Sequence, residues 1–215
     1  MTARAVAGID EAWNAALPEA SPAARQRVLS DVVARYAQEH RVYHGVAHLA
    51  SVVGWVQRLG RHCTDPAATV LAAFFHDAVY EIGDAGNEAA SAQLARGSLI
   101  ELGLDAARVD RVAALVVVTA DHVVPAGAEL SADAAVLCDA DLAILGESDA
   151  AYDRYVAAVR REYASVPDDL WRTGRRHVLD AFLQRNAIYA TPPMAEERET
   201  AARRNLERER TMLVG

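Results

Sequence analysis

The sequence predicts an all-α protein that folds as a single helical domain. Three segments begin with a capping residue followed by proline, at 21–22, 65–66 and 191–192, and this pairing commonly starts a helix. Alanine is abundant, which also favours helices. No segment shows a convincing alternation of apolar and polar residues, and no hairpin dipeptide is present. These observations together exclude a sheet-based fold.

The expected helices follow one another with short connections. In chain order they cover 21–38, 46–59, 65–80, 87–102, 105–119, 149–163, 168–187 and 191–209. The segment 122–133 carries Pro125 and Gly127 and is expected to be a loop. We expect one domain over 1–215, with 1–40 as an N-terminal helical extension. Residues 190–215 are expected to form a C-terminal helix that packs on this domain or extends from it.

Composition limits the classes of function. The chain has 215 residues and 52% hydrophobic residues, which is typical of a globular protein with a substantial core. Its 22 basic and 30 acidic side chains give a net charge of -8. This balance argues against a nucleic-acid polymer as partner, because phosphate backbones require a basic surface. It still permits a small phosphorylated substrate, which needs only local positive charge.

The two cysteines, Cys63 and Cys138, belong to no CxxC pair and are expected to be free thiols. Free thiols are typical of a reducing cytoplasm. The N-terminal residues lack the apolar core of a signal peptide, and no charge-free apolar stretch reaches the length of a membrane span. We therefore expect a cytoplasmic protein with no membrane partner.

Three apolar segments are interrupted by side chains that can bind a metal. The interrupting residues are His44 and His48, the adjacent His76 and Asp77, and the closely spaced Asp139 and Asp141. An ionised carboxylate in apolar surroundings costs several kcal/mol unless it is paired or bound to a cation. Two histidines and two carboxylates from separate segments could converge on one divalent cation, which would compensate the buried charge.

Each interruption also has a structural explanation. A single histidine on an apolar face is more often a hydrogen-bonded core residue than a metal ligand. Asp139 could cap a helix that carries Leu142 and Leu145. The combination of the three sites therefore carries more weight than any one of them.

The order His48, then His76-Asp77, then Asp141 resembles the HD-domain superfamily of metal-dependent phosphohydrolases. The segments "HLASVV", "AAFFHDAVYE" and "CDADLAIL" carry this likeness. Further blocks, namely "RVYHGVAH", "NEAASA", "VRREY" and "NAIYATP", are similar to a small bacterial subfamily of predicted HD phosphohydrolases. The blocks span roughly 41–193, which is most of the chain.

The resemblance implies a helical bundle of the HD-domain type and one divalent metal ion held by His48, His76, Asp77 and Asp141. Manganese, magnesium, zinc, iron, cobalt and nickel are not distinguished by these residues. The implied activity is hydrolysis of a small phosphorylated substrate, such as a nucleotide, by a metal-activated water. The second oxygen of Asp77 could orient that water or accept its proton.

Related hydrolases use an acid shortly after the doublet, and Glu81 matches that place better than Glu88 does. The neighbouring Asn87 can be explained as a helix cap. His44 is one helical turn before His48 and could donate to a substrate phosphate, or it could be a buried hydrogen-bonded histidine. Arg41 is near enough in sequence to join His44 in binding substrate.

His122 is the one additional histidine between the doublet and Asp141, where some superfamily members bind a second metal. We expect it to contact the substrate phosphate or to be a peripheral ligand; the alternative is a loop residue near Asp121. Arg160 could also reach a phosphate. Its alternative is a surface salt bridge with Glu162 or Asp153.

The same residues are also compatible with functions other than hydrolysis. A non-catalytic sensor could use the same metal site to bind a nucleotide or phosphorylated metabolite, and a structural metal would only link the helices. A di-iron oxygenase would need more ligands than the sequence offers. The alanine-rich surface of 87–96 is compatible with a homodimer, although an amphipathic helix looks the same inside one chain.

Overall fold

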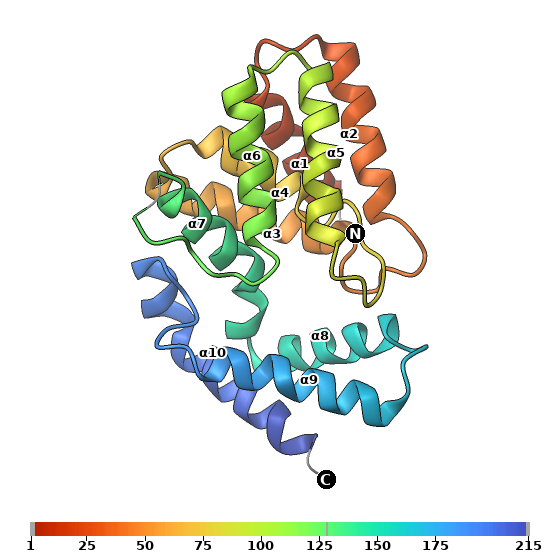
Figure 1. Cartoon of the computed structure of the whole chain (residues 1–215), viewed down its shortest axis with the longest axis vertical. Coiled ribbons are helices and arrows are strands. Elements are labelled where there is room, and N and C mark those ends of the chain that lie inside the picture. The colour runs from red at the N-terminus through yellow and green to blue at the C-terminus, as the bar shows by residue number, and fades with distance from the viewer. Residues whose placement is uncertain (1–2, 128, 214–215) are drawn as a thin grey trace. The chain divides into compact units, whose positions relative to one another are not determined.

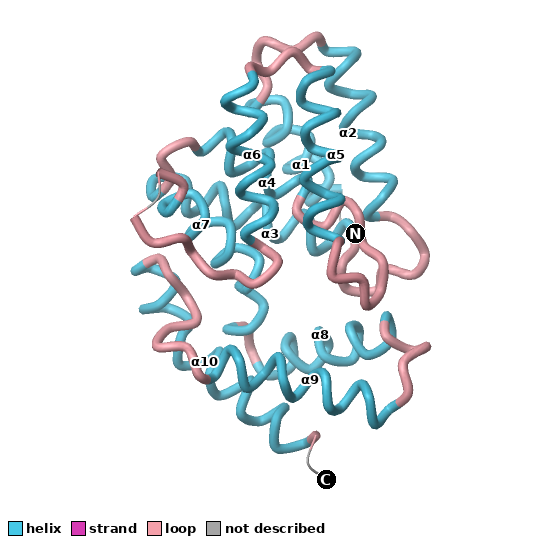
Figure 2. Tube along the Cα trace, in the orientation of Figure 1, coloured by secondary structure: helices cyan, strands magenta, loops and turns pink. Residues whose placement is uncertain are grey.

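The structure is a computed structural model that describes residues 3–127 and 129–213. Every regular element within these ranges is helical (Figures 1 and 2), which confirms the all-α prediction. The contacts within the chain group it into two compact units, Met1–Asp141 and Leu142–Gly215. The expected single domain stays a prediction.

The first unit contains seven α-helices and one short 3₁₀ helix among its described residues. They are α1 (Ala3–Ala16), α2 (Pro22–Tyr36), α3 (Val46–Leu59), η1 (Gly60–His62), α4 (Pro66–Phe75), α5 (Asn87–Glu101), α6 (Ala106–Val118) and α7 (Ser131–Asp141). Capping explains where several of them begin. The side chains of Ser21, Asp65 and Asp105 accept hydrogen bonds from backbone N–H groups in the first turns of α2, α4 and α6.

Helix α4 is the central element of this unit. Its residues from Ala68 to Phe75 are all buried, and it contacts α1, α3, α5, α6 and α7. Trp13 of α1 packs edge-on against Phe74, with ring centroids 4.9 Å apart. A helix that is apolar on every side can be stable only when neighbours cover all of its faces, and that is its situation here.

The doublet lies just beyond the regular part of α4. We expected a helix over 65–80, but α4 ends at Phe75, His76 is its C-cap and Asp77 follows in a turn. The hydrogen bond from the N–H of Ala78 to the carbonyl of Phe75 tightens this turn. The helix ends here because the backbone of Asp77 and Ala78 is bound by side chains from elsewhere in the unit.

The helix predicted over 46–59 is confirmed as α3 (Val46–Leu59), but the expected places of His44 and Asp139 relative to helices are wrong. Helix α3 begins at Val46, so His44 lies in the preceding turn and not one helical turn before His48. A Cβ on the N-cap Gly45 would lie 3.3 Å from the carbonyl oxygen of Tyr36, so this close approach favours glycine. Asp139 does not cap a following helix, because it lies in the last turn of α7 and is buried.

The second unit contains η2 (Leu142–Gly146), α8 (Asp149–Glu162), α9 (Asp168–Leu183) and α10 (Pro192–Met212). The amide of Asn205 on α10 donates to the carbonyl oxygens of Leu145 and Glu147, at 2.9 Å each. A Cβ on Gly146 would lie 2.6 Å from the Cβ of Arg198, so only glycine allows α10 to approach η2 this closely. These contacts join η2 to the longest helix of the unit.

Two further expectations concern the chain as a whole. Cys63 and Cys138 are free thiols, as predicted. Within the described ranges, no helix combines the length and the apolar character that a membrane crossing requires.

Candidate metal centre

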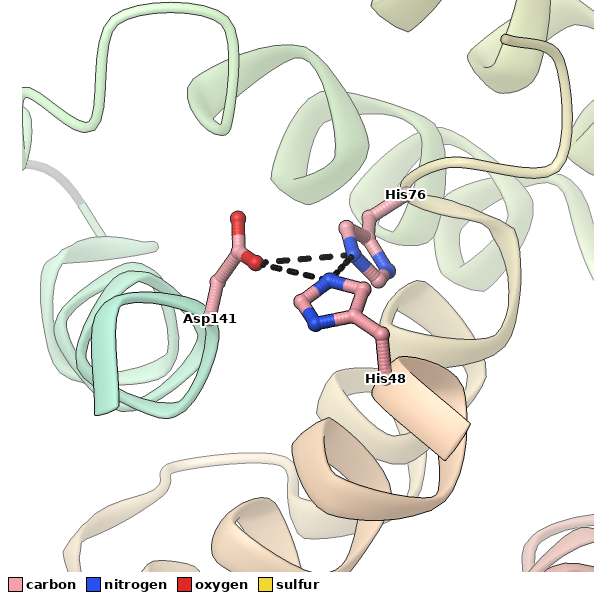
Figure 3. Close-up of side chains that lie close together, drawn as sticks. All are labelled: His48, His76 and Asp141. Carbon is pink, nitrogen blue, oxygen red and sulfur yellow. Dashed lines mark hydrogen bonds and ion pairs between the residues drawn. The ribbon is translucent and has the colours of Figure 1, made fainter. Parts of the chain in front are cut away.

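Three predicted ligands meet in the first unit. The Nε2 atoms of His48 and His76 are 3.1 Å apart, and Oδ1 of Asp141 lies 3.1 Å from the first and 3.6 Å from the second. Figure 3 shows the two rings and the carboxylate pointing toward one another. Their facing atoms all lie within 4.8 Å of one another, so this group could hold a metal ion.

Three different helices supply these side chains. His48 is in the first turn of α3, His76 caps the C-terminus of α4, and Asp141 is the last residue of α7. Both α3 and α7 pack against α4. The centre therefore forms where two helices pass the end of the central one, and it depends on the packing of residues far apart in sequence.

Asp77 is also part of the cluster. Its Oδ2 lies 3.3 Å from Nε2 of His76 and 3.6 Å from Nε2 of His48. Its side chain retains 15% exposure, whereas that of His76 is fully buried. The two carboxylates thus lie on the solvent-accessible side of the cluster, and the two imidazole rings lie on its buried side.

The distances suit one divalent ion. Four ligands arranged tetrahedrally at about 2.0–2.1 Å from a zinc ion are about 3.3 Å from one another. The separations within the group of His48, His76 and Asp141, 3.1–3.6 Å, bracket that value. Two imidazole nitrogens and two carboxylate oxygens also form a donor set that zinc, manganese, iron, cobalt and nickel accept.

A second hydrogen bond orients the His76 ring. Its Nδ1 lies 2.8 Å from the carbonyl oxygen of Ala73, one turn back in α4, so Nδ1 carries the hydrogen and donates. In the neutral ring, Nε2 then holds the lone pair that a metal requires. Such outer partners commonly fix the tautomer of metal-binding histidines.

The pKa values of the side chains in the metal-free cluster explain why the cluster attracts a cation. Burial lowers the pKa of His76, but the carboxylates of Asp77 and Asp141 outweigh it and raise the pKa to about 9. Burial would raise the pKa of Asp77, yet His76 and His44 hold it well below its usual range. The pKa of Asp141 is also low, because His76, His122 and His48 overcome its burial. Both acids are thus ionised at neutral pH and attract positive charge.

His122 reaches the cluster from the turn after α6. Its Nε2 lies 2.7 Å from Oδ2 of Asp141, the oxygen turned away from His48. Its φ of 52° is the one positive φ among the described non-glycine residues. Such a conformation is uncommon outside glycine and persists only where the surroundings hold it. His122 therefore contacts the predicted ligand Asp141 directly, while its predicted role as a phosphate contact or a peripheral metal ligand stays a prediction.

The structure also places the other predicted residues. The His44 ring centroid lies 5.6 Å from that of His48 and 4.5 Å from that of Tyr80, and His44 contributes to the low pKa of Asp77.

Glu81 is exposed, and its backbone N–H and C=O are bound by the amide of Asn87. The suggestion that Asn87 is a helix cap is wrong, since Gly86 is the N-cap of α5.

The pKa of Glu88 is influenced by the charged residues of the centre. Burial raises the pKa of Glu88, and Asp77 and Asp141 raise it further. The start of α5 is fixed beside the doublet, because Ser91 Oγ accepts from the N–H of Val79 at 3.0 Å. Spacing from the doublet alone favours Glu81 over Glu88. A sequence signal for this arrangement is the spacing of Asn87 and Ser91, which are four residues apart and so share one face of α5. From that face both side chains bind the backbone that follows the doublet.

The two arginines predicted to bind substrate make contacts within the protein. Arg41 is buried and donates to the carbonyl oxygens of His44, Asp77 and Ala78. In the second unit, Arg160 donates to the carbonyl oxygens of Tyr163 and Val166 and to the carboxylate of Asp168. Both side chains thus have partners within the protein, and their predicted phosphate contacts stay predictions. The expected salt bridge of Arg160 is formed with Asp168 and not with Glu162 or Asp153.

Comparison of the chain with protein-family models, with curated proteins and with solved structures found no match in any of the three. The likeness to the HD-domain superfamily therefore rests on the chain's own residues.

Proposed function

We propose that this protein is a metal-dependent phosphohydrolase of the HD-domain type, acting on a small phosphorylated substrate. The observation that carries the proposal is the convergence of His48, His76, Asp77 and Asp141 within the first unit. These residues come from three separate segments, in the order that the superfamily uses. Their convergence supports one shared ligand over three unrelated core residues.

The fit to a divalent ion supports the proposal further. His76 has its Nδ1 committed to Ala73, which leaves Nε2 for a metal. Asp77 and Asp141 bring two negative charges, and His76 must take up a proton to balance part of that charge when no ion is bound. A divalent ion would replace this proton and compensate both acids.

A bound ion would polarise a phosphoryl oxygen and lower the pKa of a water. The residues of the chain supply the remaining parts. Asp77 is ionised because its pKa is low, and its second oxygen can orient the attacking water, whose own pKa a bound metal would lower. Glu88, whose pKa is raised, is the better-placed second acid and replaces Glu81 in the proposed catalytic set. His44 and His122 border the cluster and can donate to a phosphate oxygen.

A non-catalytic sensor is the second candidate, and one observation favours it. Arg41 and Arg160, the cations expected to hold a phosphate, donate to groups of the protein itself. A phosphate at this centre would depend on the metal and on histidines. A module that binds a phosphorylated ligand without turnover needs no more than that.

Metal content and hydrolysis measured on the same preparation test the proposal. Wild type, Asp77→Ala and the surface control Asp110→Ala would be purified without a histidine tag, and bound metals measured by elemental mass spectrometry. Asp110 is 66% exposed and pairs with Arg96 on α5, so its loss leaves the centre intact. Activity would then be assayed on nucleotides and phosphate esters with added manganese, magnesium, zinc, cobalt or nickel.

We expect near-stoichiometric metal and turnover in wild type and in Asp110→Ala, and neither in Asp77→Ala. Metal with tight binding of a phosphorylated ligand but no turnover would favour the sensor. A folded wild-type chain with no affinity for any of the metals would contradict both candidates.

A further inference from the structure

The backbone of Asp77 depends on side chains for both of its hydrogen bonds. Asp77 follows the end of α4, where the helix no longer provides partners for the last carbonyl groups. Its N–H donates to Oη of Tyr36 at 3.1 Å, and its carbonyl oxygen accepts from Nη1 of Arg41 at 2.6 Å. The two peptide groups that flank the Cα of Asp77 are thus each held by a side chain, one from the end of α2 and one from the loop that follows.

Arg41 also links the two segments that carry the first ligands. Its Nη2 donates to the carbonyl oxygen of Ala78 at 3.2 Å, next to the doublet. Its Nη1 donates to the carbonyl oxygen of His44 at 3.3 Å, two residues before α3 begins. Because α3 carries His48, this guanidinium connects the start of one ligand helix to the end of another.

Aromatic rings hold the guanidinium in place. Its central carbon lies 5.2 Å from the ring centroid of Tyr36 and 5.4 Å from that of Tyr80. Cation–π contacts of this kind are strongest where water is excluded, and Arg41 is only 8% exposed. Nε donates to the side chain of Gln38 at 3.1 Å, so every nitrogen of the guanidinium has a partner within the chain.

We propose that Arg41 and Tyr36 are positioning residues that hold the Asp77 peptide so that its carboxylate faces the two histidines. This proposal rests on the metal-binding part of the proposed function. Arg41 acts through Asp77, whereas the hydroxyl of Tyr36 contacts both the N–H of Asp77 and, at 3.4 Å, Nδ1 of His76. Loss of either residue would weaken metal binding. Arginine is required at this position because its planar fork reaches several carbonyl groups at once, which a lysine ammonium cannot do from the same stem.

The structure offers a matched control in the same unit. Arg111 of α6 donates from Nε and Nη2 to the fully buried carboxylate of Asp133 on α7, at 3.0 and 2.6 Å. That carboxylate in turn accepts from the N–H groups of Thr64 and Asp65. Arg111→Lys would therefore disturb an internal arginine network that contacts none of the predicted ligands.

The experiment is a cobalt titration of the full chain by calorimetry, with the visible absorption spectrum of Co²⁺ as a second readout. The variants are Arg41→Lys, Tyr36→Phe and the control Arg111→Lys, each melted in EDTA to measure the stability of the metal-free protein. Tyr36→Phe keeps the ring beside Arg41 and removes one oxygen, so it tests the proposal even where Arg41→Lys does not fold.

We expect Arg41→Lys and Tyr36→Phe each to weaken Co²⁺ binding by roughly 10-fold to 100-fold, as changes around metal ligands commonly do. The Co²⁺ spectrum should change in both, since the position of one ligand changes. Arg111→Lys should lower the melting temperature and keep affinity and spectrum at the wild-type values. The same pattern in a chain that hydrolyses none of the esters would support the positioning role and contradict the phosphohydrolase.

Wild-type affinity and spectrum in both Arg41→Lys and Tyr36→Phe would overturn the proposal, whatever their melting temperatures. Equal weakening in the Arg111→Lys control would also overturn it, because the effect would then be a general loss of stability. A wild-type chain that binds no Co²⁺ would overturn the positioning role together with the metal centre.

Discussion

Two buried carboxylate clusters of this protein, one in each unit, are compensated in different ways. In the second unit, Glu209 of α10 accepts two hydrogen bonds from Arg175 of α9, at 2.7 and 3.0 Å, and one from the hydroxyl of Tyr152. Its charge is balanced by a cation that the sequence itself supplies. In the first unit, Asp77 and Asp141 face histidines, which carry charge only when they take up a proton.

This difference separates a structural ion pair from a binding site. The Arg175–Glu209 pair is complete, and both side chains are almost fully buried. The centre around His76 has an excess of negative charge that a proton relieves only in part, and its carboxylates keep some exposure. A buried cluster that lacks a cation of its own, yet is open on its acidic side, is where an external cation is expected.

From the comparison of the two clusters, the largest effect on metal binding is expected for Asp141→Ala. Asp141 contacts His48, His76 and His122, so its removal takes away a ligand and half of the negative charge. We expect metal binding to fall below detection in elemental mass spectrometry, with retained helicity by circular dichroism. Stoichiometric metal in a folded Asp141→Ala protein would show that the ion is held elsewhere.

The matching change in the second unit is Glu209→Gln, which removes one charge of the buried pair. Removing one partner of such a pair typically costs about 3–5 kcal/mol, because the other charge stays buried and uncompensated. Urea denaturation should show this loss of stability. Metal affinity should remain that of wild type, and a parallel loss of affinity would contradict the contrast between the two units.

The pH dependence sharpens the contrast. The pKa of His76 is raised from its usual 6.5 to about 9, so its contribution to the stability of the metal-free protein is full below pH 6.5. That contribution is lost as the pH rises through about 9. Metal competes with the same proton, so apparent affinity should rise by about tenfold per pH unit over this window. Calorimetry in buffers of different ionisation enthalpy would measure the proton released; no release would contradict the assignment of His76 as a ligand.

Glu88→Gln tests the proposed second acid against Glu81→Gln. Loss of an acid–base group typically lowers turnover on the order of a hundredfold. We expect that loss in Glu88→Gln, at unchanged metal affinity, because Glu88 senses the charges of Asp77 and Asp141. The exposed Glu81 should be replaceable with little effect. The opposite ranking in steady-state assays would restore the prediction made from spacing.

The smallest effect is expected for His122→Asn. Asparagine tolerates positive φ, so the backbone of the turn is preserved while the contact to Oδ2 of Asp141 is lost. Metal affinity should weaken by about tenfold, as for other outer partners of metal ligands. A complete loss of metal in the same calorimetric titration would instead make His122 a ligand itself.

Much of the fold could be read from local signals. The helix starts at Ser21, Asp65 and Asp105 follow from capping chemistry, which depends on a few neighbouring residues. The helix predicted over 65–80 is confirmed for Pro66–Phe75, the part in which the apolar residues are buried. The sequence also suggested candidate metal donors, because only a few residue types bind metals and these interrupt apolar segments. The resemblance to the HD-domain superfamily selected His48, His76, Asp77 and Asp141 among them.

Tertiary structure alone decided where that set converges and what surrounds it. The packing of the helices ends α4 before Asp77. It also makes Arg41 a partner of the Asp77 and Ala78 carbonyl groups, where the sequence predicted a substrate contact. It places Glu88 where the charges of Asp77 and Asp141 raise its pKa. Each of these depends on contacts between residues tens of positions apart. Local propensity carries no information on such distances, since they are set by how the helices pack around α4.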